Sequence, residues 1–318
     1  MKPPYEITNS ILKHISSISE KIGEIKSARL IKPPTELRKK NRIKTIQSSL
    51  EIEGNTLTVE QITDLINNKR VLAPQKDILE VKNAIVLYSK LNEFNVYQLE
   101  SLYNAHAILM KGLIDQAGKL RTSSVGIVKG DEVAHIAPPG HLIYSLLSDL
   151  FEYLKNDDDL VLVKSCVFHY EFEFIHPFVD GNGRMGRLWQ TLILKEYSPV
   201  FEFLPMETLI KERQSDYYNV LGKSDRQGNS TLFIEFMLSI INDALEELLN
   251  SQNVNLSGSD RILAYKYIIG EEYFSRQDYL RHNKEISSAT ASRDLKEAVD
   301  SGILLKEGEK RMTRYKFK

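Results

Sequence analysis

The hydrophobic positions of the chain repeat mainly with the period of an α-helix. Within residues 6–27 the apolar side chains recur three or four positions apart, and the pair Pro33-Pro34 interrupts any continuation. A second helix is predicted to start at Thr35, whose hydroxyl can cap it, and to stop near Gly54-Asn55. Further helical patterns follow one another from residue 59 to residue 250. The chain is therefore predicted to be mainly α-helical.

Two stretches depart from this helical period. Residues 125–137 hold two short apolar runs around a polar turn, which predicts a β-hairpin. The last part of the chain shows three helical patterns followed by two short strands around a charged turn, the order of a small winged-helix (α+β) domain. A polar stretch separates this part from the rest and reads as a linker. The predicted domains are 1–58 (N-terminal helices), 59–249 (core), 250–258 (linker) and 259–318 (winged helix).

The composition excludes several classes of protein. Apolar residues make up 42% of the 318 positions and charged residues 27%, so a disordered chain is excluded. The net charge of -1 argues against a chain that is basic throughout and coats nucleic acid or membranes. No apolar leader or 18-residue apolar run is present, and the single cysteine, Cys166, cannot form an internal disulfide. These features predict a cytoplasmic protein.

The segment HPFVDGNGRMGR, residues 176–187, carries the clearest chemical signal. An amphipathic helix follows it, so the unpaired N–H groups of its first turn converge near Gly181, Asn182 and Gly183. Arg184 and Arg187 lie three positions apart on a face away from the apolar one and can donate to the same anion. This arrangement predicts a site for a polyphosphate.

Two other residues of the segment suit chemistry on a phosphate. Asp180 directly precedes the glycines and offers the hard oxygen ligand that Mg2+ prefers. His176 heads the loop and is a candidate general base for a hydroxyl that attacks the phosphate.

The segment resembles the signature HPFx[D/E]GNGRxxR of Fic-domain proteins, and the resemblance extends over roughly residues 35–245. It implies a helical Fic core with a short β-hairpin flap, and an activity that transfers AMP from ATP to a hydroxyl of a target protein. The implied class is a nucleotidyltransferase, a protein adenylyltransferase. The matching positions are His176, Pro177, Phe178, Asp180, Gly181, Asn182, Gly183, Arg184 and Arg187.

The resemblance also implies a role for each residue. His176 would take the proton of the target hydroxyl, and Asp180 would hold Mg2+. Phosphate oxygens would be bound by Asn182, by the backbone of its two glycine neighbours, and by the two arginines. A related kinase branch carries lysine where this chain has Gly183, so the glycine favours AMP transfer.

Two further regions resemble parts of the family. The hairpin at 125–137 resembles the flap on which a target protein lies as an added strand. Asp216-Tyr217-Tyr218-Asn219 resembles a tyrosine pair downstream of the signature, and Tyr218 is the candidate for the adenine pocket, with Asp225 as a nearby polar contact. Because tyrosines at helical spacing also build cores, a purely structural role is the alternative. Self-modification and a homodimer are further expectations.

The segment from Ser49 to Gly54 resembles the inhibitory motif [S/T]xxxE[G/N] of Fic proteins. Ser49 and Glu53 are four positions apart and flank the face expected to pack. A carboxylate beside a packed face needs a cationic partner. The resemblance implies that Glu53 pairs with Arg187 and takes the place of the ATP γ-phosphate, so that the enzyme is held inactive.

Alternatives to this interpretation stay open. The winged helix carries basic residues near the start of its third helix (Arg293 and Lys296) and on its wing (Lys310, Arg311 and Arg314), but acids are interleaved with them. A protein-docking or dimer role and DNA binding are both compatible with this pattern. A DNA-binding regulator with a nucleotide-sensing Fic core, and an enzyme that removes AMP, are therefore the alternative functions.

Overall fold

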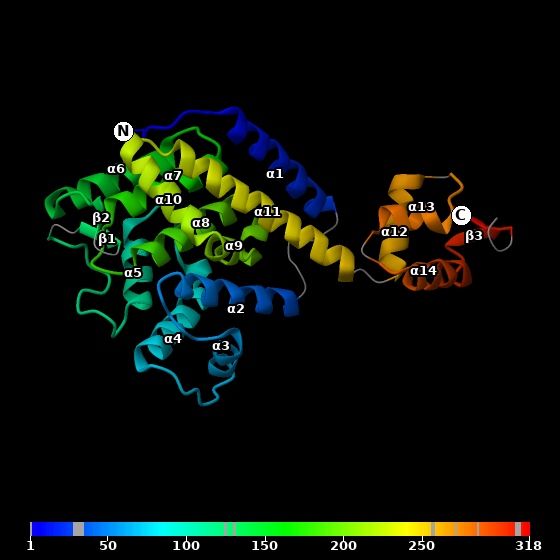
Figure 1. The fold of residues 1–318 in the computed structure, drawn as a ribbon, viewed down its shortest axis with the longest axis horizontal. Helices are drawn as coiled ribbons and strands as arrows, with labels where there is room; N and C mark the ends of the chain where they lie inside the picture. The colour runs from blue at the N-terminus through cyan, green and yellow to red at the C-terminus, as the bar shows by residue number, and fades with distance from the viewer. Residues whose placement is uncertain are drawn as a thin grey trace. The chain divides into compact units, whose positions relative to one another are not determined.

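The computed structural model describes residues 2–27, 35–123, 126–129, 132–255, 258–270, 272–284, 286–308 and 313–318. The chain divides into two compact units, Met1–Leu245 and Glu246–Lys318 (Figure 1). Both are built mainly from helices with short two-stranded antiparallel sheets, which confirms the predicted fold class.

Two N-terminal helices match the first two helical patterns. Helix α1 (Asn9–Ser27) buries isoleucines three, four and seven positions apart. The N-terminal segment meets the start of α11 (Thr231–Asn255), where the Ser230 amide donates to the Pro4 carbonyl at 3.0 Å. Helix α2 (Thr35–Glu51) ends three residues before Gly54, so Glu53 lies in the turn that follows the helix rather than within it. The interrupting Pro33-Pro34 lies outside the described residues.

The centre of the larger unit is the pair α7 (Val161–Ile175) and α8 (Asn182–Tyr197). Ten of the 15 residues of α7 are buried, most of them apolar, and α8 buries the predicted apolar stripe from Met185 to Ile193. Helix α2 and the 3-10 turn η3 (Pro199–Phe203) also contact α8 (Figure 1). Because α8 is covered on several sides, its polar residues are buried as well as its apolar ones.

The elements around this pair are short and closely connected. The helices are α3 (Val59–Ile66), α4 (Gln75–Ser89), α5 (Leu99–Leu109), α6 (Ile143–Asn156), α9 (Met206–Glu212) and α10 (Gln214–Gln227), with 3-10 turns η1 (Leu91–Glu93) and η2 (Gly140–Leu142).

The predicted hairpin lies between α5 and α6. Strands β1 (Gly126–Lys129) and β2 (Glu132–Ile136) pair antiparallel, with an irregularity in register between Ile127 and Val128. The predicted turn residues Gly130 and Asp131, and Val125 at the start of the first strand, lie outside the described residues. Strand β2 contacts α10.

The smaller unit contains three helices followed by two strands, in the order predicted from the sequence. They are α12 (Gly258–Ile269), α13 (Arg276–His282), α14 (Ser288–Asp300), β3 (Leu304–Glu307) and β4 (Arg314–Phe317). Phe274 adds an antiparallel bridge to Tyr315, so a third segment joins this sheet. The predicted wing residues Lys310 and Arg311 lie outside the described residues.

Helix α11 continues to Asn255, so most of the predicted linker of residues 250–258 is helical. Leu256 and Ser257 lie outside the described residues, and α12 starts at Gly258. The domain boundaries drawn from the sequence stay predictions.

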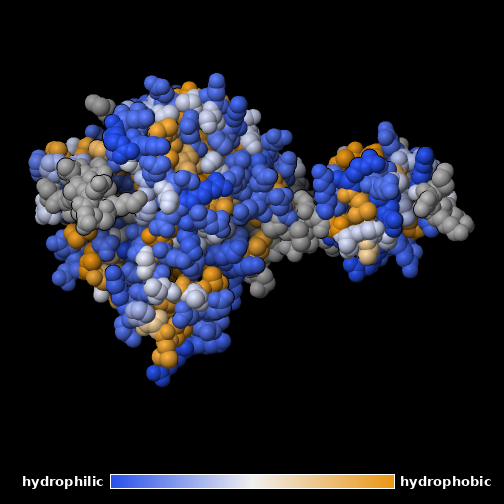
Figure 2. Space-filling model, in the orientation of Figure 1, coloured by the Kyte–Doolittle hydropathy of each residue, from blue (hydrophilic) through white to orange (hydrophobic). Residues whose placement is uncertain are grey.

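Polar residues cover most of the visible face of each unit, with apolar residues in scattered patches (Figure 2). Among the described residues, none of the helices combines the length and the apolar character that a membrane span requires.

One buried carboxyl lies between α2 and α9. Glu207, the second residue of α9, is only 1% exposed. Burial raises its pKa from 4.5 to about 7, although a hydrogen bond with Thr45 of α2 and the charge of Arg187 act in the opposite direction. Because the folded state holds this proton more tightly than the unfolded state, stability is lost as the pH rises from about 4.5 through 7.

We therefore expect Glu207→Gln to stabilise the protein at pH 8 by up to about 3 kcal/mol relative to wild type and to have little effect at pH 4.5. The measurement is urea unfolding at both pH values followed by the fluorescence of Trp189, the only tryptophan, which is buried in α8. Glu212→Gln, at the exposed end of α9, is the control. An identical pH dependence of the Glu207 variant and wild type would contradict the prediction.

Candidate active site

The signature loop begins where α7 ends. His176 follows the helix with φ 48° and ψ 61°, a left-handed conformation that few residues with a Cβ adopt. This conformation turns the chain out of the helix and into the loop. The buried Arg121 holds the turn from the other side, because its backbone N–H donates to the Pro177 carbonyl at 2.9 Å and its side chain binds four more carbonyls. These carbonyls are those of His176 (2.6 Å), Ser123 (2.6 Å), Pro138 (2.8 Å) and Ile175 (3.0 Å).

The loop is closed by Asn182, the first residue of α8. Its side-chain oxygen accepts from the Phe178 amide and its side-chain nitrogen donates to the Phe178 carbonyl, each at 2.9 Å. The Asn182 side chain is therefore committed to the loop, and only its backbone N–H faces the anion position predicted from the sequence. Gly181 precedes it with φ 84°, and a Cβ there would lie 2.8 Å from the Met110 sulfur. A glycine is required at this point of the turn.

His106 of α5 supports the loop from below. Its ring stacks on that of Phe178, with centroids 3.6 Å apart and planes 7° from parallel. Its Nδ1 accepts from the Gly118 amide at 2.8 Å, which leaves Nε2–H to donate to the Asp180 carbonyl at 2.9 Å. Burial lowers the pKa of His106 to about 4, so the ring is neutral and keeps this donor and acceptor pattern at physiological pH.

Arg187 lies buried against the end of α2, with 1% of its side chain exposed. Its Nη2 contacts the Glu53 carboxylate at 2.7 Å and the Ser49 carbonyl at 2.9 Å, and its Nε donates to the Ser49 hydroxyl at 3.2 Å. Burial alone would lower the pKa of Arg187, but the charge of Glu53 and its hydrogen bond raise it above its usual value. The structure thus brings together the two residues of the predicted inhibitory motif and the second arginine of the signature.

Arg184 is also buried and paired within the protein. Its Nη1 lies 3.2 Å from Glu80 of α4, and its Nη2 lies 3.2 Å from Asp180. From the sequence, both signature arginines were predicted to be free for a ligand. In the structure each is neutralised by carboxylates of the chain itself, as burial requires.

Gly183 lies in the first turn of α8, directly beneath the Glu53 carboxylate. A Cβ at this position would overlap Oε1 of Glu53 and would lie 3.1 Å from Nη1 of Arg187. The carboxylate therefore occupies the helix N-terminus, where unpaired backbone N–H groups and the helix dipole favour a negative charge. A side chain at Gly183 would have to displace the Glu53 carboxylate from this position.

Asp180 offers the carboxylate that could hold a metal ion. Its Oδ1 accepts from the Gly181 amide at 2.6 Å and from Arg184, while its side chain is 48% exposed. A half-exposed carboxylate oxygen next to an anion-binding turn suits a hard cation such as Mg2+. A second group of acids, Asp157, Asp158 and Asp159, lies between α6 and α7, and Lys2 forms an ion pair with two of them.

The comparison with known proteins agrees with this geometry. The model of the Fic/DOC family matches residues 96–194, which include the whole loop and most of α8. A Fic family protein from Desulfovibrio desulfuricans G20, known from its crystal structure, is 40% identical to the chain. The two structures superimpose with a TM-score of 0.77 over 100% of this chain and 98% of the other. The chain belongs to the Fic family.

Curated relatives of this Fic protein carry more specific names. A "Protein adenylyltransferase Fic" of Nematostella vectensis is 25% identical over 271 residues, which cover 80% of this chain and 60% of the relative. A "Probable protein adenylyltransferase" of Aquifex aeolicus is 26% identical over 233 residues, 66% of this chain and 71% of the relative. The chain spans about a third to three fifths of the length of the first curated relatives it matches.

The tyrosine pair of the Fic core separates into two environments. Tyr217 is buried, and its hydroxyl lies 3.0 Å from Nε2 of His169, so it belongs to the core. Tyr218 is half-buried and its pKa is raised, first by burial and then by the charge of Glu53. Asp225, the predicted polar contact near the adenine, accepts from the Tyr170 hydroxyl at 3.0 Å.

Sequence reasoning missed three residues that hold the Fic site together. Arg121, His106 and Glu80 are buried polar residues that contact the signature from outside it. Their partners in the signature are 55 to 104 positions away. No pattern in the sequence marks these residues, and Arg121 is followed directly by the polar Thr122 and Ser123.

Arg121→Met should lower the free energy of unfolding by about 3 kcal/mol or more, because it leaves buried carbonyl groups without donors. Arg121→Lys keeps one charge but not the planar set of donors and should recover only part of the loss. Urea unfolding monitored by Trp189 fluorescence measures both variants. The control is Lys119→Met, a change at an exposed residue two positions away. Equal stability of the Arg121 and Lys119 variants would show that the hydrogen bonds of Arg121 to the loop carbonyls do not stabilise the protein.

Proposed function

We propose that this Fic protein is a protein adenylyltransferase that is held inactive by its own α2 segment. It would transfer AMP from ATP to a hydroxyl of a target protein and release pyrophosphate. Two findings support the reaction: the complete signature forms one loop at the N-terminus of α8, and several curated relatives are named protein adenylyltransferases.

In this proposal the loop residues divide the work of phosphoryl transfer. His176 accepts the proton of the target hydroxyl as its oxygen bonds to the α-phosphorus of ATP, and the bond from that phosphorus to the β-phosphate bridging oxygen breaks. The backbone N–H groups of Asn182 and Gly183 bind phosphate oxygens. Arg184 and Arg187 hold the remaining phosphates, which positions the α-phosphate for in-line attack.

Asp180 would hold Mg2+ through its half-exposed carboxylate. When bound with ATP, the ion would neutralise phosphate charge at this end of the loop. The hydrogen bond from the Gly181 amide fixes the orientation of the carboxylate before any ligand arrives.

The observation that best supports the proposed inhibition is the position of Glu53. Its carboxylate pairs with Arg187 at 2.7 Å and lies over Gly183, at the end of α8 where a phosphate would bind. A second anion cannot occupy the same position, and carboxylate and phosphate would repel each other beside the buried Arg187, although the Glu53 side chain is 31% exposed. Glu53 must leave Arg187 before the terminal phosphate of ATP can reach it. Ser49 helps by binding the same guanidinium.

The residues around the loop suit the other parts of the substrates. The β1–β2 hairpin is proposed as the flap that receives a target segment as an added strand. Half-buried Tyr218 is proposed for the adenine pocket. The resemblance to the family favours AMP transfer over the kinase reaction, because the kinase branch carries lysine where this chain has Gly183.

We also propose that the smaller unit is a winged helix that docks a protein or a second copy of the chain. DNA binding is the alternative, since Arg293 and Lys296 are exposed on α14. Asp294 does not oppose DNA as the sequence suggested, because it is buried in an ion pair with Arg261 at 2.8 Å. Exposed Glu297 still lies beside these cations, and α14 therefore presents mixed charge.

We expect Glu53→Gly to raise AMP incorporation at least about 10-fold and the additional change His176→Ala to reduce it by about 100-fold or more. The measurement is transfer of label from α-labelled ATP with Mg2+, with self-modification as the readout and γ-labelled ATP in parallel. Asp180→Asn in the activated background should raise the Mg2+ concentration needed for half-maximal transfer.

Glu51→Ala is the matched control for the inhibitory contact. Glu51 lies two positions before Glu53 and pairs with Lys211 instead of Arg187, so its loss should raise labelling much less than the loss of Glu53. Equal labelling by wild type and Glu53→Gly would rule out the inhibition, and label from the γ position alone would indicate a kinase. Absence of label in every sample would favour removal of AMP or the DNA-binding regulator.

A further inference from the structure

Glu80 of α4 links two parts of the site that are far apart in the sequence. Its Oε1 lies 3.2 Å from Nη1 of Arg184, and its Oε2 accepts from the side-chain amide of Asn55 at 2.8 Å. The Glu80 side chain is only 9% exposed. One buried carboxylate thus contacts both the first arginine of the signature and the segment that directly follows Glu53.

Asn55 is itself fixed on every side. Its side-chain nitrogen also donates to the Asp77 carbonyl at 3.1 Å, and its side-chain oxygen accepts from the Leu57 amide at 3.1 Å. Its backbone N–H donates to the Leu50 carbonyl at 3.1 Å, which closes the turn after α2. Glu53 lies within this closed turn, so the position of Asn55 determines where the inhibitory carboxylate can lie.

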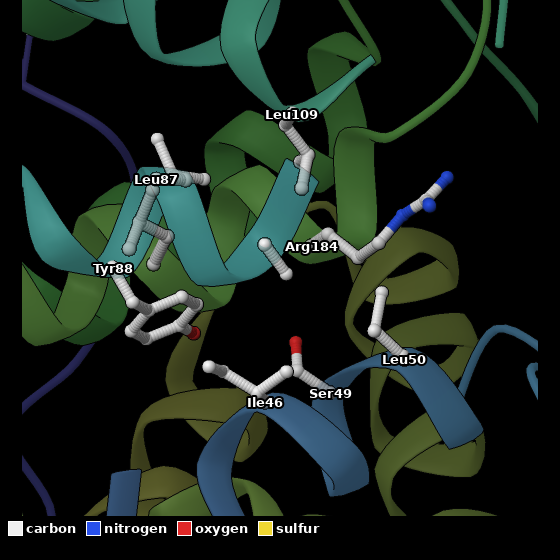
Figure 3. A pocket seen from close by; sticks show the side chains of 9 residues that line it. Ile46, Ser49, Leu50, Leu87, Tyr88, Leu109 and Arg184 are labelled. Atoms are coloured by element: carbon white, nitrogen blue, oxygen red, sulfur yellow. The ribbon is translucent and has the colours of Figure 1, made fainter. Parts of the chain in front are cut away.

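Both apolar and polar contacts hold the C-terminal part of α2. Ile43, Ile46 and Leu50 are buried, and a small cavity of about 10 Å³ remains between α2, α4, α5 and α8. Figure 3 shows the Ser49 side chain pointing into this cavity, with Arg184 on its far side. The turn that follows α2 adds the buried hydrogen bond between Asn55 and Glu80.

We propose that Glu80 is a positioning residue that couples the inhibitory turn to the phosphate-binding Arg184. With Glu80 present, Arg184 is shared between two carboxylates, and Asp180 keeps an oxygen exposed. Without the Glu80 charge, Arg184 would pair with Asp180 alone and compete for the carboxylate assigned to Mg2+. Through Asn55, the same Glu80 carboxylate holds the turn that carries Glu53. The inference rests on the proposed function of this site.

The two contacts of Glu80 predict different effects when each is removed. In the Glu53→Gly background, Glu80→Gln should raise the KM for ATP about 10-fold, the size of one charge-assisted hydrogen bond, with a smaller change in kcat. In the wild-type background, Asn55→Ala should raise AMP transfer about 5-fold, because the inhibitory turn loses its anchor. In the Glu53→Gly background, Asn55→Ala should have no activating effect.

Asn83→Ala is the matched control on the same helix. Asn83 lies one turn after Glu80, is equally buried, and donates to the carbonyls of Leu109 and Lys111 without contacting the signature. It should lower the thermal unfolding temperature without changing ATP affinity. A merely structural role for Glu80 predicts that the Glu80 and Asn83 variants behave alike.

Calorimetric titration of the full chain with ATP and Mg2+ gives a readout that does not depend on catalysis. An approximately 10-fold weaker Kd for Glu53→Gly/Glu80→Gln than for Glu53→Gly supports the coupling even if no variant transfers AMP, in which case the proposed function alone fails. Equal Kd values for these two variants, or activation by Asn55→Ala that persists in the Glu53→Gly background, would overturn the inference.

Discussion

The burial of two guanidinium groups in α8 is the constraint on which the site depends. Arg184 and Arg187 lie in a helix that is covered by α7, η3 and α2, so water cannot hydrate either guanidinium group. Each must find anions, and in this structure the chain supplies Glu53 and Glu80 from outside the signature and Asp180 from within it. A nucleotide would have to replace contacts that already satisfy both arginines. In the proposed function, inhibition and substrate binding therefore compete for the same charges.

The same constraint explains why α2 docks although it is a largely polar helix. An isolated helix of this composition has little apolar surface to bury. Besides its buried Ile43, Ile46 and Leu50, hydrogen bonds and ion pairs to α4, α8 and α9 hold its end. The hydrogen bond between Asn55 and Glu80 is buried, whereas the Glu53 side chain in its pair with Arg187 is 31% exposed. Polar contacts depend on geometry more steeply than apolar ones, so the docked position of the turn is specific.

The mainly helical fold, the hairpin and the signature loop could be predicted from the sequence, because each is encoded within a short segment. The period of apolar residues defines the helices, and the residues from His176 to Arg187 are contiguous. The pairing of Glu53 with Arg187 came from a family resemblance that joins residues 134 positions apart. Periodicity alone could not have supplied it.

The contacts that were missed involve single buried polar residues. Arg121 binds carbonyl groups, which every residue carries, so no pattern of side chains reveals its partners. The supporting role of His106 becomes clear only in the structure, where its ring stacks on that of Phe178. The helical end of the predicted linker was missed for another reason, since polar residues such as Asn and Gln occur both in linkers and on exposed helices.

An ion pair on the surface next to the turn after α2 offers positions at which sequence changes could adjust the proposed inhibition. Glu51 and Lys211 are about one third exposed and contact neither the loop nor the arginines of α8. Substitutions there can change how long the turn stays docked while the chemistry of the signature is untouched. Relatives with the same active site could in this way differ in resting activity, each set by surface residues that a comparison of catalytic motifs would overlook.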